Sequence, residues 1–111
     1  MSDSALPAAY SIVRSDDCVV LGGEIDIAAV HELRAEFAAL TDGSRPVTID
    51  LRDVSFIDSS GIEALVAARR DAERAGGSVV LLAPSPAVAR VLEVAGLDDV
   101  FRIERAAADD R

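Results

Sequence analysis

The chain has 111 residues, of which 50% are hydrophobic and 28% are charged. A single domain of this length buries roughly 65% of its unfolded surface, enough for a core without a metal ion or a disulfide. The formal net charge of -9 argues against binding to nucleic acid or to an anionic membrane surface, because both depend on cationic patches. All eleven basic residues are Arg, which excludes Schiff-base chemistry on a lysine.

The chain holds one cysteine and one histidine, so a zinc site made of these residue types is not expected. Cys18 lies in an alternating segment and is expected to be a half-buried strand thiol, and His31 is expected to be exposed. No metal site and no cofactor are therefore expected. Residues 1–9 lack a basic stretch followed by an apolar one, and no run approaches the ~18 apolar residues of a membrane span, so a cytoplasmic protein is expected.

The first half of the chain predicts a hairpin, a helix and a strand. Residues 10–14 and 18–22 are β-rich runs separated by Ser-Asp-Asp, which predicts an antiparallel pair. Apolar residues at 30, 33, 37 and 40 predict an amphipathic helix that ends near residues 42–43. Residues 46–51 then predict a strand, which residues 54–57 continue to a pair of serines.

The second half predicts two further helices and two further strands. A helix is expected from the serines to the Gly-Gly pair at 76–77, followed by a buried strand over 78–83. Ser85 and Pro86 predict the cap and first turn of a third helix that stops at Gly96, and residues 100–103 predict a short strand. The expected fold is α/β: a single domain over residues 8–104 with a mixed sheet of about five strands and three main helices, between flexible tails at 1–7 and 105–111.

The paired serines are the chief candidate for a functional site. Ser59 and Ser60 follow an apolar strand and precede Gly61 at the expected start of a helix, where open α/β sheets commonly place their sites. Free first-turn amides and the helix dipole favour an anion there, so a serine at this place is a plausible phosphate carrier. A purely structural role is also open, because residues 60–63 fit a capping box and Asp26 fits the cap of the first helix.

Four motifs in order resemble the STAS domain, and more closely the stand-alone bacterial anti-sigma factor antagonists, over about residues 8–104. They are Gly-Glu-Ile-Asp at 23–26, the run from Asp to Ile at 50–62, Gly-Gly at 76–77 before a buried strand, and Ser-Pro at 85–86 leading to Ala-Gly-Leu at 95–97. Any one of these motifs is weak evidence, and their common order makes the resemblance specific.

The resemblance implies a regulatory function. In that family the serine directly after the motif's aspartate is phosphorylated by an anti-sigma factor that is also a protein kinase, which here implies Ser59, with Ser60 as the fallback. The unphosphorylated form is expected to bind this anti-sigma factor and serine kinase and so release a sigma factor, and phosphorylation is expected to switch binding off. A phosphatase is a further expected partner. Asp58 precedes the helix, and Asp26 matches a family acid near the phosphoserine.

The docking surface is expected to include Ile57, Gly61 and Ile62. Glu63 stands where the family usually has a small residue, and a carboxylate there is expected to repel an acidic partner. Ala29 replaces a common hydroxyl or amide residue, which leaves Asp26 to cap its helix alone.

Other classes of protein stay open at this stage. The chain also fits a STAS subunit of a lipid ABC transporter, or a STAS interaction module that is not phosphorylated. A hydrolase is disfavoured because no Gly-x-Ser-x-Gly motif surrounds either serine, and no enzyme activity is expected.

Overall fold

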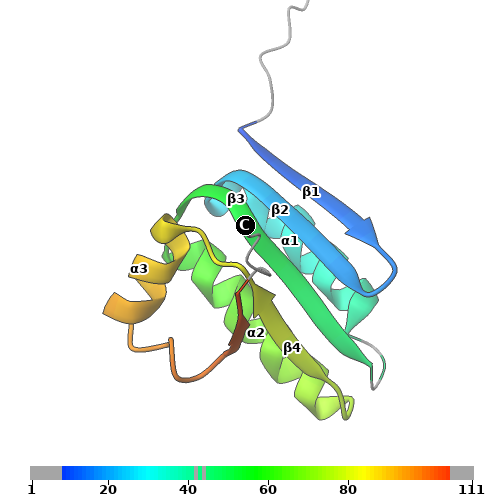
Figure 1. Cartoon of the computed structure of the whole chain (residues 1–111). Coiled ribbons are helices and arrows are strands. Elements are labelled where there is room, and N and C mark those ends of the chain that lie inside the picture. Colours follow the sequence, from blue (N-terminus) through cyan, green and yellow to red (C-terminus); the bar gives the residue numbers. More distant parts are fainter. Residues whose placement is uncertain (1–8, 42, 44, 106–111) are drawn as a thin grey trace, which may run out of the picture.

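The structure is a computed structural model that describes residues 9–41, 43 and 45–105. Its elements are β1 (Tyr10–Ser15), β2 (Cys18–Ile25), α1 (Ile27–Leu40), β3 (Pro46–Ile57), α2 (Ser59–Arg74), β4 (Ser78–Leu82), α3 (Pro86–Val94) and β5 (Arg102–Glu104) (Figure 1). The expected α/β fold, with five strands and three helices in this order, is confirmed. The tails expected at residues 1–7 and 105–111 lie outside the described residues, except for Arg105.

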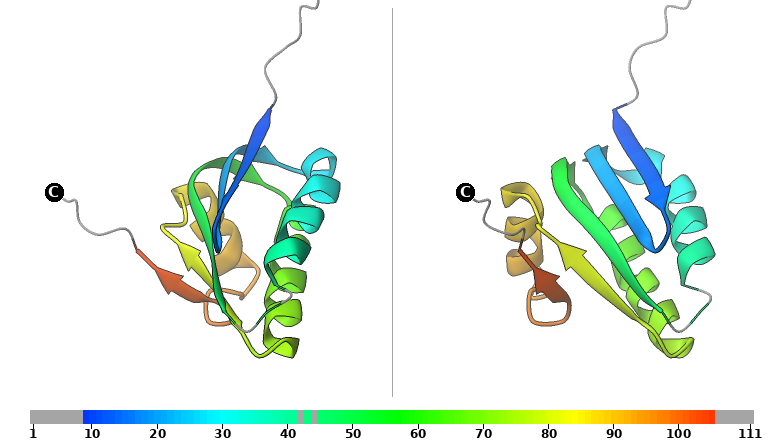
Figure 2. Two further views of the ribbon diagram at one scale, coloured as in Figure 1. Left: turned by 90° about the vertical axis from the view of Figure 1, so that its right-hand side faces the viewer. Right: turned by 45° about the vertical axis from the view of Figure 1, so that its right-hand side comes forward.

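The five strands form one mixed sheet in the order β1-β2-β3-β4-β5. β1 pairs with β2 in antiparallel fashion, as the hairpin prediction requires, whereas the remaining neighbours are parallel. α1 and α2 lie side by side on one face of this sheet (Figure 2). α3 packs against β3, where the Ser85 amide donates to the Leu51 carbonyl over 3.2 Å.

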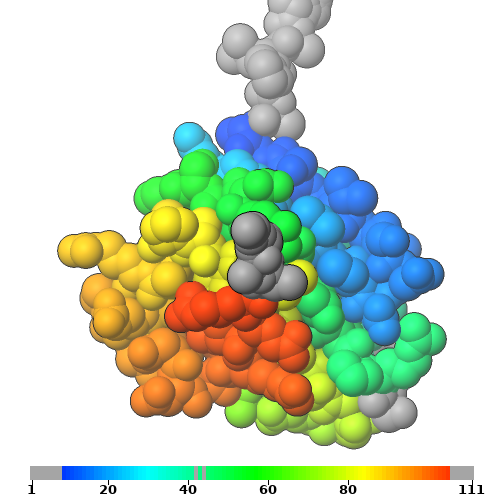
Figure 3. Space-filling model, in the orientation of Figure 1, coloured from blue at the N-terminus to red at the C-terminus, as the bar shows by residue number. Residues whose placement is uncertain are grey.

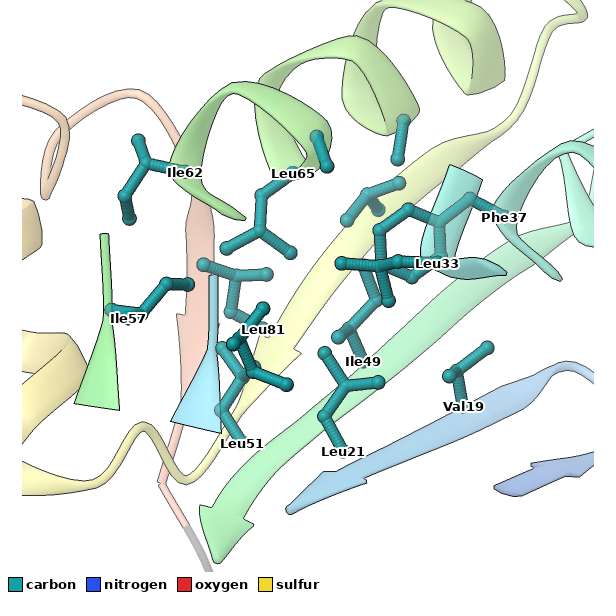
Figure 4. Close-up of a cluster of buried hydrophobic side chains, with 14 of the residues drawn as sticks. Val19, Leu21, Leu33, Phe37, Ile49, Leu51, Ile57, Ile62, Leu65 and Leu81 are labelled. Atoms are coloured by element: carbon teal, nitrogen blue, oxygen red, sulfur yellow. The ribbon is translucent and has the colours of Figure 1, made fainter. Parts of the chain in front are cut away.

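The core is aliphatic and lies between the sheet and the helices (Figure 4). Its largest fully buried side chains come from every layer: Leu21, Ile25, Leu33, Ile49, Leu51, Leu65, Leu81, Leu92, Val19, Val47, Val54 and Val88. On α1 the fully buried positions are Ala29, Leu33 and Phe37, whereas Val30 and Leu40 of the predicted face are half-buried. An alanine at the sheet-facing position lets the first turn of α1 lie close to the sheet.

Several strands differ in length from the sequence prediction. β2 continues to Ile25, and β3 is one strand of 12 residues. The pairing between β2 and β3 has two register shifts, which let both strands stay paired up to Ile25 and Ile57. β5 begins only at Arg102, because Phe101 turns into the core and Ile103 pairs with Leu81.

The helix caps follow the sequence closely at α1 and α3. The Asp26 carboxylate accepts a hydrogen bond from the Ala28 amide over 3.0 Å, and the Ser85 hydroxyl accepts one from the Val88 amide over 3.3 Å. α1 ends at Leu40, before residue 42 of the predicted stop, which lies outside the described residues. None of the helices in the described part of the chain is long and apolar enough to cross a membrane.

Candidate functional site

Two strand ends and two helix starts meet at one edge of the sheet. β2 and β3 run parallel, and each is followed by one cap residue and then a helix. The Asp58 amide donates a hydrogen bond to the Ile25 carbonyl over 3.1 Å, which ties the two strand ends together. The capping residues Asp26 and Asp58 therefore lie on adjoining turns. We refer to residues 24–27 and 56–63 as the serine edge.

Asp58, and not Ser60, caps α2. Its backbone is extended, and its Oδ1 accepts a hydrogen bond from the Gly61 amide over 3.1 Å. Ser60 already lies within the helix, so the capping box predicted from Ser60 and Glu63 is wrong. The Asp58 carboxylate, directly after β3, accepts a hydrogen bond from the Gly61 amide in the first turn of α2 and so performs the capping role. Ser59 is the first residue of α2 and is exposed.

Gly61 holds the start of α2 against the end of β2. A Cβ atom on this glycine would lie 2.7 Å from Ile57 Cγ1, 3.0 Å from Ile25 Cγ2 and 3.1 Å from the Ile25 carbonyl oxygen. The 2.7 Å separation is shorter than real Cβ contacts and the other two are unusually tight, so a larger residue would require the helix or its neighbours to shift. Gly61 thus fixes the position from which Ser59 faces solvent.

The structure corrects the composition of the expected docking surface. Ile57 is 3% exposed and Ile62 is 7% exposed, and both side chains point into the core, where they support the serine edge from inside (Figure 4). The large apolar side chains that do face solvent here are Ile27, 71% exposed, and Phe56, 48% exposed. The sequence analysis missed both. Two positions in the sequence could have indicated their exposure: Ile27 directly follows a helix cap, and Phe56 is next to the buried Ile57 in a strand, where neighbouring side chains point to opposite faces.

The serine edge is rich in carboxylates. The two segments that build it and its surroundings, 22–30 and 53–63, contain five acidic residues and no arginine. The acidic residues are Glu24, Asp26, Asp53, Asp58 and Glu63, of which Glu24 lies beside Phe56 in the β2–β3 pairing. Glu63 is exposed on the first turns of α2. The serine edge therefore combines exposed apolar side chains with negatively charged ones.

The other singled-out residues lie away from the serine edge. Cys18 is half-buried at the start of β2, as predicted, and burial, followed by the charges of Asp50 and Asp17, raises the pKa of its thiol. His31 is exposed on α1, also as predicted. Within residues 9–41, 43 and 45–105, no group of three or more His, Cys, Asp or Glu side chains is arranged to hold a metal ion.

Two surface hollows are separate from the serine edge. One, of about 340 Å³, lies beside α3 and β5 and includes Arg90 and Arg105 in its lining. The other, of about 260 Å³, lies near the β1–β2 turn and includes Arg45. Neither hollow is lined by a residue of the serine edge, which presents side chains outward and so suits contact with a protein surface.

Comparison with known proteins gives consistent matches over most of the chain. The STAS domain family matches residues 9–109. An anti-sigma F factor antagonist of Lysinibacillus sphaericus is 34% identical over 88 residues, which is 78% of this chain and 75% of that protein. An anti-sigma-B factor antagonist of Bacillus subtilis is 32% identical over 89 residues, which is 80% of this chain and 82% of that protein.

The solved structures that resemble this one include the anti-sigma factor antagonist SpoIIAA in two forms. The unphosphorylated form has a TM-score of 0.70 and 26% identity, with 92% of this chain and 91% of that chain covered. The phosphorylated form, from Bacillus, has a TM-score of 0.66 and 25% identity, with 92% and 94% covered. These matches lead to one conclusion: the chain belongs to the STAS domain family and resembles its bacterial anti-sigma factor antagonists.

Proposed function

We propose that this protein is an anti-sigma factor antagonist of the cytoplasm that acts by binding and not by catalysis. In its unphosphorylated form it binds an anti-sigma factor that is also a serine kinase, and the bound anti-sigma factor releases a sigma factor. Phosphorylation of Ser59 switches binding off, and a phosphatase restores it. The observation that carries the proposal is the exposed residue Ser59 at the first position of α2, directly after Asp58.

The effect of a phosphate follows from the start of α2. A phosphate adds ~1.5 to 2 negative charges near neutral pH, and a helix N-terminus stabilises such charge by only ~0.3 to 1 kcal/mol. Here the Asp58 carboxylate already accepts the hydrogen bond from the Gly61 amide. The phosphate therefore competes with a carboxylate for the helix start. A docked partner would have to desolvate this added charge, so its binding weakens.

Asp26 is proposed to assist at the same place. It caps α1 next to the turn that carries Asp58, and its carboxylate is half-exposed. Asn caps a helix about as well as Asp does. Asp26→Asn therefore removes the charge while it keeps the cap, and it separates a role in partner contact or phosphorylation from a role in folding.

The test begins with the partner. Affinity capture from the native cell with the Ser59→Ala protein, which lacks the proposed phosphorylation site, should yield an anti-sigma factor with kinase activity. The purified kinase is then incubated with the wild-type, Ser59→Ala and Asp26→Asn proteins, and its affinity for each is measured by titration. We expect phosphate on wild type only at Ser59. We also expect at least ~10-fold weaker binding after phosphorylation, which equals about 1.4 kcal/mol.

The contrary outcomes are specific. Full phosphorylation of Ser59→Ala, with the phosphate on Ser60, would move the site to Ser60. Equal affinity of the phosphorylated and unmodified proteins would reject the switch. Capture of an ABC ATPase in place of a kinase would assign the chain to a lipid transporter, and a partner that never phosphorylates it would leave a plain interaction module. If Asp26→Asn loses binding only as far as it loses stability, Asp26 is a cap alone.

A further inference from the structure

The hollow beside α3 and β5 has the size of a small-molecule site and a lining that is both apolar and charged. Its volume of about 340 Å³ falls within the ~300 to 1,000 Å³ that is typical of ligand pockets. Apolar surface comes mainly from Ala89, Leu92 and Ile103. The charged residues of the lining are two arginines and two acids: Arg90, Arg105, Glu93 and Asp98. A lining of this kind can contact both the apolar and the charged parts of one ligand.

The charged residues stand on walls that face each other. On α3, Arg90 and Glu93 are three residues apart and so lie on one face of the helix. On the opposite wall, Arg105 comes two residues after Ile103, so both side chains lie on the same side of the sheet. Figure 3 shows the yellow and orange surface of α3 next to the red surface of β5. The hollow is therefore built by two elements that are adjacent in space.

The two positive charges belong to the end of the hollow where α3 begins. The Ala83 amide donates a hydrogen bond to the Glu104 carbonyl over 2.6 Å, which places Arg105 beside the loop that leads into α3. Arg90 lies in the middle of α3, and helical side chains lean toward the N-terminus of their helix. Arg90 and Arg105 therefore form a basic end.

The two negative charges belong to the end of the hollow where α3 stops. Glu93 lies in the last turn of α3, one turn after the arginine. The Leu97 amide donates a hydrogen bond to the Leu92 carbonyl over 2.8 Å, which turns the chain back and brings Asp98 next to this last turn. The hollow thus has an acidic end opposite its basic end.

The four charged residues do not pair with one another. Arg90 and Glu93 have a spacing that allows an ion pair on a helix, yet no ion pair in the described part of the chain joins two charged residues of this lining. A guanidinium group has five N–H donors, and a carboxylate accepts hydrogen bonds on both oxygens. These donors and acceptors are therefore not used within the lining.

We propose that this hollow binds a small dipolar molecule with a carboxylate at one end and an ammonium group at the other, of which an ω-amino acid is the simplest example. Its carboxylate accepts hydrogen bonds from Arg90 and Arg105, and its ammonium group donates to Glu93 and Asp98. The methylene chain between them contacts Ile103 and its apolar neighbours. A ligand with a single charge leaves one end of the hollow without a counter-charge, so it binds more weakly. This site is additional to the proposed function and does not involve the phosphorylated serine.

The ligand class is tested with three probes that share one carbon chain: γ-aminobutyrate, butyrate and butylamine. Each probe is titrated into the whole isotope-labelled protein near neutral pH and at constant ionic strength. NMR shifts of the backbone amides report both the place of binding and the Kd. We expect γ-aminobutyrate to shift the amides of residues 89–93 and 103–105, and to bind at least ~5-fold more tightly than either butyrate or butylamine.

Arg90→Gln with Arg105→Gln tests the basic end. This double variant should bind γ-aminobutyrate and butyrate at least ~5-fold more weakly, whereas its affinity for butylamine should not fall. The matched control is Arg34→Gln with Arg70→Gln, which removes two exposed arginines of α1 and α2 and changes the net charge equally. The control should bind all three probes within ~2-fold of wild type, because salt screens distant exposed charges.

Glu93→Gln with Asp98→Asn tests the acidic end. This double variant should lose affinity for γ-aminobutyrate and butylamine, and should bind butyrate at least as well as wild type does, because repulsion between carboxylates is removed. The matched control is Glu24→Gln with Asp71→Asn, exposed on β2 and α2, which should leave the three affinities unchanged. A loss of stability would not produce opposite effects of the two double variants on butyrate and butylamine.

Three outcomes would overturn the proposal. If none of the probes gives saturable shifts around the hollow, it is not a binding site for this class of molecule. If butyrate or butylamine binds as tightly as γ-aminobutyrate does, the site recognises a single charge and not a dipolar ligand. If the double variants at the two ends bind γ-aminobutyrate as wild type does, the four charged residues are not its ligands.

Discussion

Gly61 sets how closely α2 approaches the end of β2. It is buried, and the nearest atoms to its missing side chain include the backbone oxygen of Ile25. A flexible side chain could move aside, but that carbonyl accepts the hydrogen bond from Asp58 that joins the two strand ends. Gly61 therefore affects both the packing of α2 and the position of Ser59, which is the first residue of that helix.

Gly61→Ala is expected to destabilise the protein. Forcing a methyl group into a filled space costs about 1 to 3 kcal/mol, and the higher helix propensity of Ala returns at most about 1 kcal/mol. A net loss of about 1 to 2 kcal/mol in the free energy of unfolding should appear in urea titrations. Gly43→Ala is the control, because no atom beyond Gly43 and its two chain neighbours lies within 4 Å of the added methyl, and it should stay within about 0.5 kcal/mol of wild type. Equal stability of the two variants would contradict the close approach of α2.

The start of α2 is set by the preceding strand and not by the capping box in its own sequence. The sequence has two adjacent serines and a glutamate in capping-box spacing, which would make Ser60 the cap, yet the cap is Asp58 and the helix begins at Ser59, two residues earlier than that spacing predicts. Pairing of β3 with β2 continues to Ile57, which brings Asp58 to the helix start in an extended conformation. From this position the Asp58 side chain can accept a hydrogen bond from the Gly61 amide three residues later.

Asp58→Ala should therefore destabilise the protein more than Ser60→Ala does. Loss of a helix cap costs about 0.5 to 2 kcal/mol, whereas Ala in place of a serine inside a helix is neutral or favourable by up to about 0.5 kcal/mol. Thermal or urea unfolding of both variants measures the difference. Asp58→Asn is the matched control, because Asn also caps helices, and it should be close to wild type. A larger loss for Ser60→Ala than for Asp58→Ala would restore the capping box.

The net charge of -9 acts on the whole molecule. The radius of gyration is 14.0 Å, whereas the Debye length is about 30 Å at 0.01 M salt and about 8 Å at 0.15 M. At low salt every charge in the molecule thus senses most of the others, and folding brings the carboxylates closer together. The described ion pairs, such as Arg14 with Glu36 and Arg69 with Glu73, are partly exposed and individually contribute only about 0.2 to 1 kcal/mol.

The free energy of unfolding is expected to rise with NaCl between about 0.01 M and 0.15 M, because screening reduces self-repulsion more than it weakens the exposed ion pairs. Urea midpoints at several NaCl concentrations measure the effect, and sucrose at matched osmolality controls for general exclusion of solutes. A fall in stability over this range would show that the ion pairs outweigh the repulsion.

The sequence by itself determined the order of the elements and the region of the candidate site. The hairpin, the apolar face of α1 and the cap and stop of α3 follow from local features: turn residues, spacing of apolar residues and a Ser-Pro pair. The two serines were assigned to a helix start from local features as well, namely the apolar strand before them and the apolar helical spacing after them. Local chemistry fixes these features because each depends on residues that are close along the chain.

Only the tertiary structure decided which side chains of the serine edge face solvent. All four residues Ile57, Ile62, Ile27 and Phe56 are large and apolar, so hydrophobicity alone does not separate the buried pair from the exposed pair. The late start of β5 and the full length of β3 were likewise set by pairing with other strands. Burial and strand register depend on contacts between segments far apart in the sequence. These contacts form only when β2, β3, α1 and α2 pack together, and that packing selects the residues that stay exposed.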